Sequence, residues 1–280
     1  MGQRSIEFSI RELDRHDDRL QCEAIQRSVW SFGDAEIVSA PMLATSQKHG
    51  GTLLGAANES GRIIGFVFGV PAEAGPVRIE HSHLLAVLPA FRNQGVARAL
   101  KRGQYRRALQ NRIPLITWTF EPLESKNAYL NLNRLGAAVR RYYCNLYGES
   151  TGSPLHSGLG TDRFLAEWKV TAAPRAAIES PPPTPEDVQS ALASRLEADG
   201  LPRPQTPELD LPGPALVEIP SDIQNLKQLA PEIARQWRTA TRSAFMHYLN
   251  RGFVVRRLRL KRDRAVSSGL RSFYYLERPL

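Results

Sequence analysis

The chain has 280 residues, 42% of them hydrophobic, which is enough to bury the core of one large domain or two modest ones. The formal net charge of +9 suits nucleic acid and an anionic phosphorylated ligand equally, so charge alone excludes neither partner. The two cysteines lack metal-ligand spacing, so we expect neither a disulfide nor a bound metal. No apolar run approaches the ~20 residues that span a bilayer, and the N-terminal MGQRSIEFSI lacks the apolar stretch of a signal peptide. We therefore expect a cytoplasmic protein without a membrane partner.

The first segments alternate between strand and helix patterns. Residues 5–13 (SIEFSIREL) alternate apolar and polar side chains, as a half-buried strand does, and the residues from Asp18 onward (RLQCEAIQRSVW) have helical spacing. Residues 51–72 (GTLLGAANESGRIIGFVFGVPA) hold two β-rich runs around NESGR, which predicts a hairpin.

Residues 81–97 (HSHLLAVLPAFRNQGVA) carry the first motif with chemical content. A strand-like run holds two histidines and leads to a turn of the form R-x-x-G-x-A, which a basic amphipathic helix follows. Small residues let backbone amides approach an anion, and a helix N-terminus adds unpaired N–H groups and partial positive charge. The turn is therefore a candidate pyrophosphate cradle, formed by Arg92, Asn93, Gln94, Gly95, Val96 and Ala97.

Basic residues continue along the helix after this turn. We expect a solvated basic face from which Arg98 and Lys101 reach ligand phosphates, while Arg102, Arg106 and Arg107 stay in solvent. A Rossmann dinucleotide site is the rival interpretation of a glycine turn, but only one glycine is present and no acidic residue follows about twenty positions later.

The second half predicts a further strand-helix-strand-strand order and then a change of character. Residues 114–120 (PLITWTF), 137–147 (AAVRRYYCNLY) and 162–170 (DRFLAEWKV) read as strands, and 125–136 (SKNAYLNLNRLG) as a helix that Gly136 ends. We place one domain at 1–170, followed by a proline-rich linker or extended arm at 171–214 with a short helix at 186–196. A C-terminal α/β region at 215–280 is expected to pack on the first domain. It contains a helix over 231–250 and two strands.

An internal echo relates residues 127–141 (NAYLNLNRLGAAVRR) to residues 243–257 (SAFMHYLNRGFVVRR) without a gap. Both segments are an amphipathic helix that ends in glycine and leads into a strand with basic residues. Two explanations stay open, a shared helix-glycine-strand solution and a partial duplication of half a domain.

The order of elements and the R-x-x-G-x-A turn resemble the GCN5-related N-acetyltransferase (GNAT) superfamily over residues 5–170. The resemblance implies an α/β (α+β) fold with a mixed, mostly antiparallel twisted sheet flanked by helices, and a C-terminal half-domain of similar β-α-β-β pattern. It implies acetyl-CoA or another acyl-CoA as co-substrate, with its pyrophosphate on the turn and no metal. Main-chain groups of Leu85 and Val87 would bind the pantetheine arm and the thioester carbonyl, and Asn127 is a further candidate cofactor-binding residue.

Within that superfamily, HSHLLAVLPAFRNQG is most similar to the arylalkylamine N-acetyltransferases, whose corresponding strand also carries H-x-H. The resemblance makes His81 and His83 candidate general bases. Spacing by two puts both rings on one face of a strand, and histidine titrates where an ammonium must lose a proton. The alternative is a pair of hydrogen-bonded core histidines.

A second resemblance, through ITWTFEPLESKNAYLNLNRLGA, GTDRFLAEW and ARQWRTATRSAF, is to bacterial predicted acetyltransferases with an extra C-terminal region. Some of them are thought to succinylate D-amino acids, which leaves the acyl group open between acetyl and succinyl and allows an amino acid as acceptor. Arg238 and Arg242, four residues apart on one helix, either grip a carboxylate or form salt bridges within the chain.

The general acid is not fixed by the sequence. The superfamily's tyrosine, four residues before the helix-ending glycine, is replaced by Leu132, so Tyr129, Tyr142, Tyr143, Tyr248 or water remain. Glu121 could be the base, bind the substrate ammonium, or be solvated.

We therefore expect an acyl-CoA-dependent N-acyltransferase, in which a small-molecule amine attacks the thioester directly. A homodimer is compatible with this expectation, and nucleic acid is not expected as a partner. Two alternatives come from other classes. One is a non-catalytic acyl-CoA-binding module, and the other is a nucleic-acid binder that uses the basic helix.

Overall fold

The computed structural model describes residues 6–149, 158–172, 187–266 and 269–279. The described chain forms two compact units. The first contains residues 6–118 and 169–172, and the second contains 119–149, 158–168 and the described residues from 187 onward. The chain passes from one to the other within the strand Leu115–Phe120, whereas the sequence placed a boundary at residue 170.

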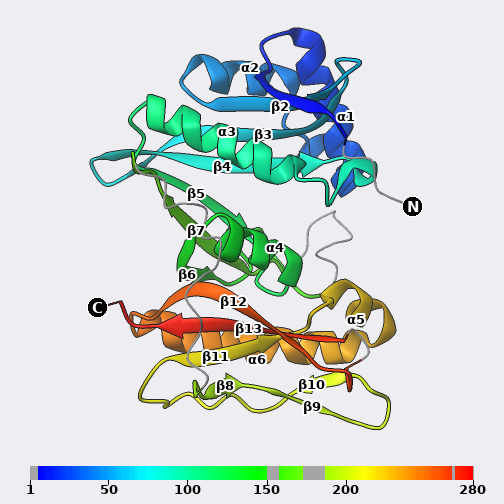
Figure 1. The fold of residues 1–280 in the computed structure, drawn as a ribbon, viewed down its shortest axis with the longest axis vertical. Helices are drawn as coiled ribbons and strands as arrows, with labels where there is room; N and C mark the ends of the chain where they lie inside the picture. Colours follow the sequence, from blue (N-terminus) through cyan, green and yellow to red (C-terminus); the bar gives the residue numbers. More distant parts are fainter. Residues whose placement is uncertain (1–5, 150–157, 173–186, 267–268, 280) are drawn as a thin grey trace. The chain divides into compact units, whose positions relative to one another are not determined.

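The first unit is a five-stranded sheet with helices on both faces (Figure 1). The strand order is β1-β2-β3-β4-β5, antiparallel except for the parallel pair β4–β5. Its elements are β1 (Phe8–Glu12), α1 (His16–Trp30), η1 (Asp34–Glu36), α2 (Ala40–Lys48), β2 (Thr52–Asn58), β3 (Ile63–Ala74), β4 (Val77–Val87), η2 (Pro89–Phe91), α3 (Val96–Gln110) and β5 (Leu115–Phe120).

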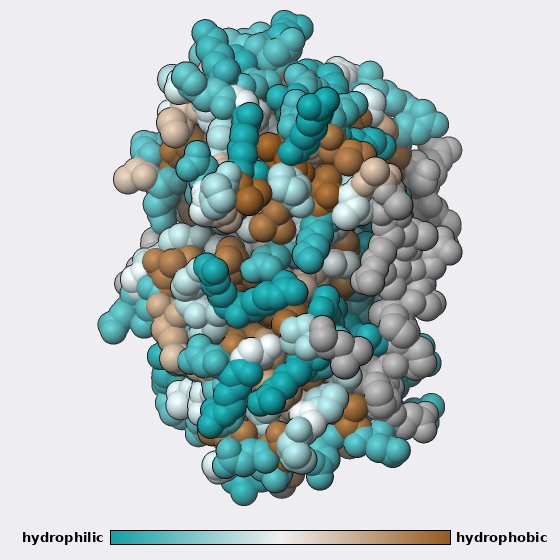
Figure 2. Space-filling view, turned by 90° about the vertical axis from the view of Figure 1, so that its left-hand side faces the viewer, coloured by the Kyte–Doolittle hydropathy of each residue, from teal (hydrophilic) through white to brown (hydrophobic). Residues whose placement is uncertain are grey.

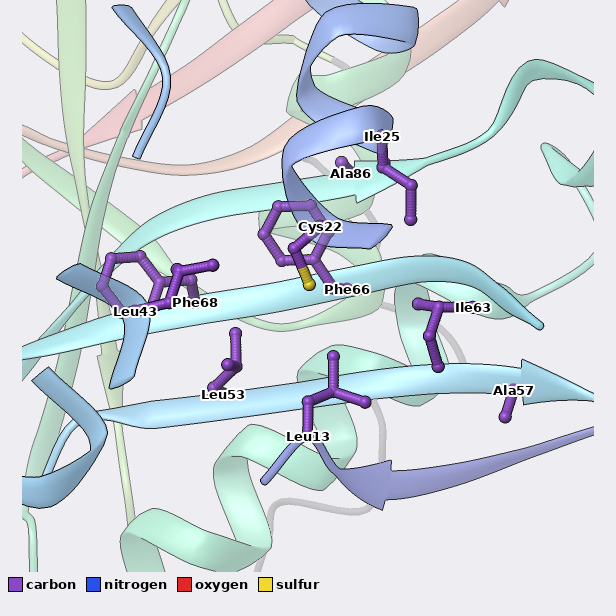
Figure 3. Close-up of a cluster of buried hydrophobic side chains, with 10 residues drawn as sticks. All are labelled: Leu13, Cys22, Ile25, Leu43, Leu53, Ala57, Ile63, Phe66, Phe68 and Ala86. Carbon is purple, nitrogen blue, oxygen red and sulfur yellow. The ribbon is translucent and has the colours of Figure 1, made fainter. Parts of the chain in front are cut away.

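Strand alternation divides the core of this unit into two layers. On one face, Cys22 and Ile25 of α1 pack on Phe66, Phe68 and other apolar side chains of β2 and β3 (Figure 3). On the other face, the apolar stripe of α3 packs on the alternate residues of the same strands. β4 therefore lies with its two faces under different helices, which is what positions the residues of the site.

The second unit has a sheet of order β7-β6-β12-β13-β11-β8, in which only β11–β8 is parallel. Its elements are α4 (Ser125–Tyr129), a π-helical turn η3 (Leu130–Arg134), β6 (Ala138–Tyr143), β7 (Arg163–Lys169), β8 (Ser190–Leu192), β9 (Ser194–Leu196), β10 (Pro202–Pro204), β11 (Ala215–Ile219), α5 (Ile223–Leu229), α6 (Pro231–Asn250), β12 (Val254–Arg262) and β13 (Leu270–Glu277). Strands β9 and β10 form a separate antiparallel pair.

Aromatic side chains fill the core of the second unit. The Phe164 ring has its centroid 4.7 Å from that of Phe245 on α6 and 5.4 Å from that of Tyr274 on β13. Tyr142 on β6 packs edge-on against Phe164, and Phe120 at the end of β5 joins the cluster. Offset and edge-to-face aromatic pairs at these distances stabilise the fold by more than the hydrophobic burial of their surface alone. The cluster joins the C-terminal helix and strands to β6 and β7 in one core.

The expected mixed, mostly antiparallel sheet flanked by helices is confirmed. From residue 215 on, the order is β11-α5-α6-β12-β13, which differs from the expected β-α-β-β pattern by the additional short helix α5. The short helix expected at 186–196 is wrong. Residues Ser190–Leu192 join β11 in parallel and Ser194–Leu196 pair with β10, so strand pairing outweighs the weak helical pattern there. The first part of the proline-rich segment, 173–186, lies outside the described residues.

Candidate active site

The pairing between strands β4 and β5 ends in the middle of β4. Pairing with β5 is parallel at Glu80↔Ile116 and His81↔Thr117, while pairing with β3 continues to Val87. The C-terminal part of β4 therefore stays paired with β3 along one edge, while its other edge, which faces away from β3, is no longer paired with β5. An extended ligand can add main-chain hydrogen bonds along such an edge.

The two residues predicted to offer main-chain groups lie on that edge. The Leu88 amide donates to the Ile64 carbonyl at 3.0 Å, so the backbone groups of Leu88 point toward β3. Backbone groups of successive strand residues alternate between the two edges, and the β3–β4 register is regular from Leu84 to Val87. Leu85 and Val87 thus direct their N–H and C=O groups away from β3. The Val87 carbonyl accepts from Arg92 Nε at 3.2 Å, which leaves Leu85 as the better placed of the two.

Both histidines lie on the same face of β4, and a β-bulge falls at the second of them. The register shifts between the pairs Gly69↔Ser82 and Phe68↔Leu84, so His83 is the extra residue. The His83 ring packs edge-on against Phe68 at 6.2 Å, and His81 is the cross-strand partner of Val70. Both Phe68 and Val70 belong to the core on the α1 and α2 side. The shared face agrees with the spacing of two in the sequence.

The two imidazoles are held neutral near physiological pH. Desolvation by the surrounding protein lowers the pKa of His83, even though its side chain is exposed. The pKa of His81 is also lowered, by burial first and then by the charges of His83 and Lys101. A neutral imidazole has a nitrogen lone pair that can accept a proton. His81 Nδ1 lies 3.1 Å from Thr117 Oγ1, a contact for which the sequence offered no signal beyond a threonine on a strand.

The turn after β4 has the geometry of an anion cradle. Asn93 and Gly95 take left-handed conformations with φ of 63° and 85°, and a Cβ added at Gly95 would meet open space. The Ala99 amide donates to the Gly95 carbonyl at 3.0 Å as the first bond of α3, so the amides of Val96, Ala97 and Arg98 are left over at the helix start. Such a site suits a pyrophosphate. The residues present therefore fit the phosphate end of an acyl-CoA.

Lys101 corrects an expectation. It does not share the solvated basic face, because its side chain is only 2% exposed and Nζ lies 3.9 Å from the centre of the Trp118 ring. Nζ donates to Gln104 Oε1 at 2.7 Å and to Ser82 Oγ at 3.1 Å, and burial lowers its pKa to about 7. An amine placed in this way is not available to a ligand phosphate. Arg98 is exposed, so its assignment stays a prediction.

The same buried network includes a carboxylate that the sequence gave no reason to expect. Glu80 accepts from Gln104 Nε2 at 2.6 Å and from Thr52 Oγ1 at 3.0 Å, and burial raises its pKa. Gly69 makes room for it, since a Cβ there would lie 2.2 Å from Glu80 Oε1. Because Glu80 and Ser82 flank His81, this network anchors the strand from the face opposite the imidazole.

In the second unit, Glu121 is neither solvated nor a free base. It accepts from Arg238 Nη2 at 2.6 Å, from the Leu123 amide at 3.0 Å and from Arg163 Nη1 at 3.3 Å. Two guanidinium groups thus neutralise it, and we do not retain a catalytic role for it. The sequence could not show this, because Arg163 and Arg238 lie 42 and 117 residues away.

Arg242 makes a second ion pair next to this one. It donates from Nε and Nη2 to the two carboxylate oxygens of Asp162 at 2.8 and 2.7 Å. Burial opposes ionisation of Asp162, but the hydrogen bonds from Arg242 and Tyr142 hold the pKa of this carboxyl below its usual range. Of the two uses considered for Arg238 and Arg242, the intrachain salt bridge is the one observed.

The candidate tyrosines and Asn127 also lie in the second unit. Burial raises the pKa of Tyr142, whose hydroxyl donates to Asp162, and Tyr248 is 1% exposed with its hydroxyl on the Glu208 carbonyl. These two are structural. Tyr129 is half-buried, with the Arg134 guanidinium over its ring, and Asn127 is exposed, so their assignments stay predictions.

The described part of the chain was also searched for membrane-spanning helices and for groups of metal-binding side chains. No helix among the described residues is long and apolar enough to cross a membrane. The described residues also contain no group of three or more histidine, cysteine or acidic side chains that could hold a metal ion. On the face shown in Figure 2, hydrophobic side chains are interspersed with hydrophilic ones.

Comparison with known proteins gives one family. Residues 15–130 match the acetyltransferase (GNAT) family, a stretch that contains β4, the turn and α3. A search of curated proteins gives no match.

Among solved structures, the chain is similar to the ribosomal-protein-S18-alanine N-acetyltransferase of Escherichia coli, with 15% identity, a TM-score of 0.47, and coverage of 61% of this chain and 98% of that one. It is also similar to the GNAT family N-acetyltransferase YhbS of Escherichia coli in complex with CoA (17% identity, TM-score 0.40, 61% and 86% covered). A third is Naa20 of Chaetomium thermophilum in complex with a bisubstrate analogue (16% identity, TM-score 0.46, 58% and 86% covered).

Proposed function

We propose that this chain, whose residues 15–130 match the acetyltransferase (GNAT) family, is an enzyme of that family that transfers an acetyl or succinyl group from acyl-CoA to the amine of a small molecule. The observation that carries the proposal is the placement of His81 and His83 on one face of β4, at the point where β4 leaves β5 and upstream of the turn that precedes α3. One strand thus presents proton-accepting groups, a main-chain edge and an anion cradle in sequence.

Acyl-CoA supplies the activated thioester when it is bound. The turn Arg92–Ala97 and the first amides of α3 would hold its pyrophosphate, and the open edge of β4 at Leu85 would hold the extended arm by main-chain hydrogen bonds. The amide of Leu85 would also polarise the thioester carbonyl, since a fixed donor stabilises the charge that develops on this oxygen.

The histidines prepare the nucleophile. An amine is protonated near neutral pH and must lose a proton before its nitrogen can attack. His83 accepts this proton, directly or through water, and His81 assists it from the same face. The neutral nitrogen would then attack the carbonyl carbon, so that a C–N bond forms as the C–S bond breaks, and the proton that this nitrogen loses as the amide forms would pass to the departing thiolate. The reaction needs no covalent bond to the protein, because one strand aligns both reactants.

The proposal is tested by a thiol-release assay with acetyl-CoA and succinyl-CoA over a panel of L- and D-amino acids and arylalkylamines, after a thermal-shift titration with each acyl-CoA. Turnover with one donor and one amine class supports the proposal and names the substrates. Saturable CoA binding without thiol release on any amine would replace it with a non-catalytic acyl-CoA-binding module, for which the leucine at position 132 is the supporting observation.

A further inference from the structure

We propose that Thr117 is a positioning residue that fixes His81 in the tautomer with its proton on Nδ1, so that Nε2 keeps the lone pair needed to accept a proton. The proposal rests on the proposed function, because it concerns the same histidine. Its evidence is separate, since it comes from the pairing of β4 with β5.

The contact is built into the sheet. His81 and Thr117 are direct partners in the parallel pairing of β4 and β5, at its C-terminal end. His81 Nδ1 lies 3.1 Å from Thr117 Oγ1, and Thr117 is only 5% exposed. A buried β-branched side chain on a strand has few rotamers available. The hydroxyl is therefore a fixed partner for the ring and does not compete with bulk water.

The chemistry of the ring then decides the direction of the bond. A neutral imidazole has one donor nitrogen and one acceptor nitrogen. Burial and the nearby charges of His83 and Lys101 lower the pKa of His81, so the neutral ring is the form present near pH 7. With Nδ1 on the threonine, Nε2 is the nitrogen left for the substrate. It can accept a proton only if Nδ1–H donates to Thr117 Oγ1, which is the arrangement we assign.

Fixing a histidine through its second nitrogen is a general way to set ring orientation and basicity. Without the hydroxyl, the ring would divide its time between two tautomers and more than one rotation. Only one of these combinations presents a basic nitrogen to the amine. Loss of the hydroxyl should therefore lower turnover and leave acyl-CoA binding unchanged.

The kinetic test compares Thr117→Val, which is nearly isosteric, with Thr117→Ser, which keeps the hydroxyl. We expect Thr117→Val to lower kcat roughly 10-fold at unchanged KM for acyl-CoA, and Thr117→Ser to restore most of the loss. Thr119→Val is the matched control, because Thr119 lies two residues along and its hydroxyl bonds to Tyr147 instead. It should leave kcat unchanged.

The double variant His81→Ala/Thr117→Val shows whether Thr117 acts through His81. If it does, the double variant is no slower than His81→Ala alone, because there is no ring left to position. Losses that multiply would overturn the proposal, as would a Thr117→Val variant with wild-type kcat alongside an impaired His81→Ala.

A spectroscopic arm separates this proposal from the proposed function. In ¹⁵N-histidine-labelled protein, the wild type should show His81 with a protonated Nδ1, and Thr117→Val should show a mixture of tautomers. An unchanged tautomer in Thr117→Val overturns the positioning role. Wild-type kcat in His81→Ala would instead remove His81 from catalysis, whatever the spectrum shows.

Discussion

Val139 and Val255 are direct partners in the antiparallel pairing of β6 with β12, and they occupy the same place in the two segments 127–141 and 243–257 that echo each other in sequence. Each follows by three residues a left-handed glycine, Gly136 with φ 74° or Gly252 with φ 82°. An antiparallel pair centred on two equivalent residues relates its strands by an approximate two-fold axis.

The irregularities of the two halves also coincide. The register of β6 against β7 shifts at Arg140, and the register of β12 against β13 shifts at the equivalent Arg256. Each of these arginines pairs with a glutamate on the neighbouring strand, Arg140 with Glu167 at 2.7 Å and Arg256 with Glu277 at 3.5 Å. A helix-glycine-strand unit has no need of a bulge and an ion pair at matching positions. The agreement favours a partial duplication over a shared local solution.

The C-terminal segment also stabilises the rest of its unit. Its helix α6 supplies Arg238, which is 5% exposed and pairs with Glu121 after β5. Removing one partner of a buried pair leaves an uncompensated charge, so we expect Arg238→Met to destabilise the protein by about 3–5 kcal/mol and to lower Tm by roughly 10 °C in calorimetry.

Two further variants make this prediction specific. Arg235→Met removes an exposed arginine of the same helix that pairs with Glu232 on the surface, and it should change stability by under about 1 kcal/mol. The double change Glu121→Gln/Arg238→Met should recover part of the loss. Equal effects of Arg235→Met and Arg238→Met would contradict the buried pair.

His83 is the residue on which the proposed chemistry depends most. We expect His83→Ala to lower kcat by about 10²-fold or more at pH 7, because an amine without a base stays protonated, and to leave the Kd for CoA unchanged in calorimetric titration. His16→Ala, which removes an exposed imidazole from α1, is the control. Undiminished turnover would remove His83 from the mechanism.

The pH profile follows from the direction of the histidine shifts. The proton-accepting form is the neutral ring, and burial lowers the pKa of both His81 and His83 below the ordinary value of 6.5. Activity should therefore be constant as pH falls through 7 and should drop only below 6.5. The measurement is kcat/KM from pH 5 to 9. An acidic limb centred above 6.5 would show that a different group is the base.

The turn before α3 allows a matched pair of glycine variants. Gly95→Glu places both a side chain and a negative charge where φ is 85°, beside the amides proposed to hold the pyrophosphate. Gly61→Glu imposes the same backbone strain at φ 80° in the β2–β3 turn, also in open space. We expect the Kd for CoA to rise by at least about 10-fold in the first variant and to stay unchanged in the second. Similar CoA affinities would disprove the cradle.

The sequence was sufficient for features that short-range pattern controls. Alternation and helical spacing located β1 to β5, α1, α3 and α6, and the spacing of His81 and His83 placed them on one face. The sequence was not sufficient where residues far apart in the chain determine whether a side chain is buried or paired. Lys101 sits in a basic stretch of α3 that looks solvated, and only the approach of Trp118 from β5 shows that it is buried. Likewise, strand-end position suggested a solvated Glu121, whereas Arg238 from a helix 117 residues later pairs with it.

The buried amine of Lys101 gives stability a definite pH dependence. In the unfolded chain its pKa is near 10.5, and burial lowers it to about 7 in the fold. Between these values the unfolded state binds one more proton than the folded state, so stability rises with pH from about 7 to 10.5. Lys101→Met removes this penalty, while Ser82 Oγ still donates to Gln104 Oε1 at 3.1 Å. We expect the variant to gain several degrees in Tm relative to the wild type at pH 7 and to lose this advantage by pH 10. A constant difference in Tm across that range would mean that Lys101 does not titrate inside the fold.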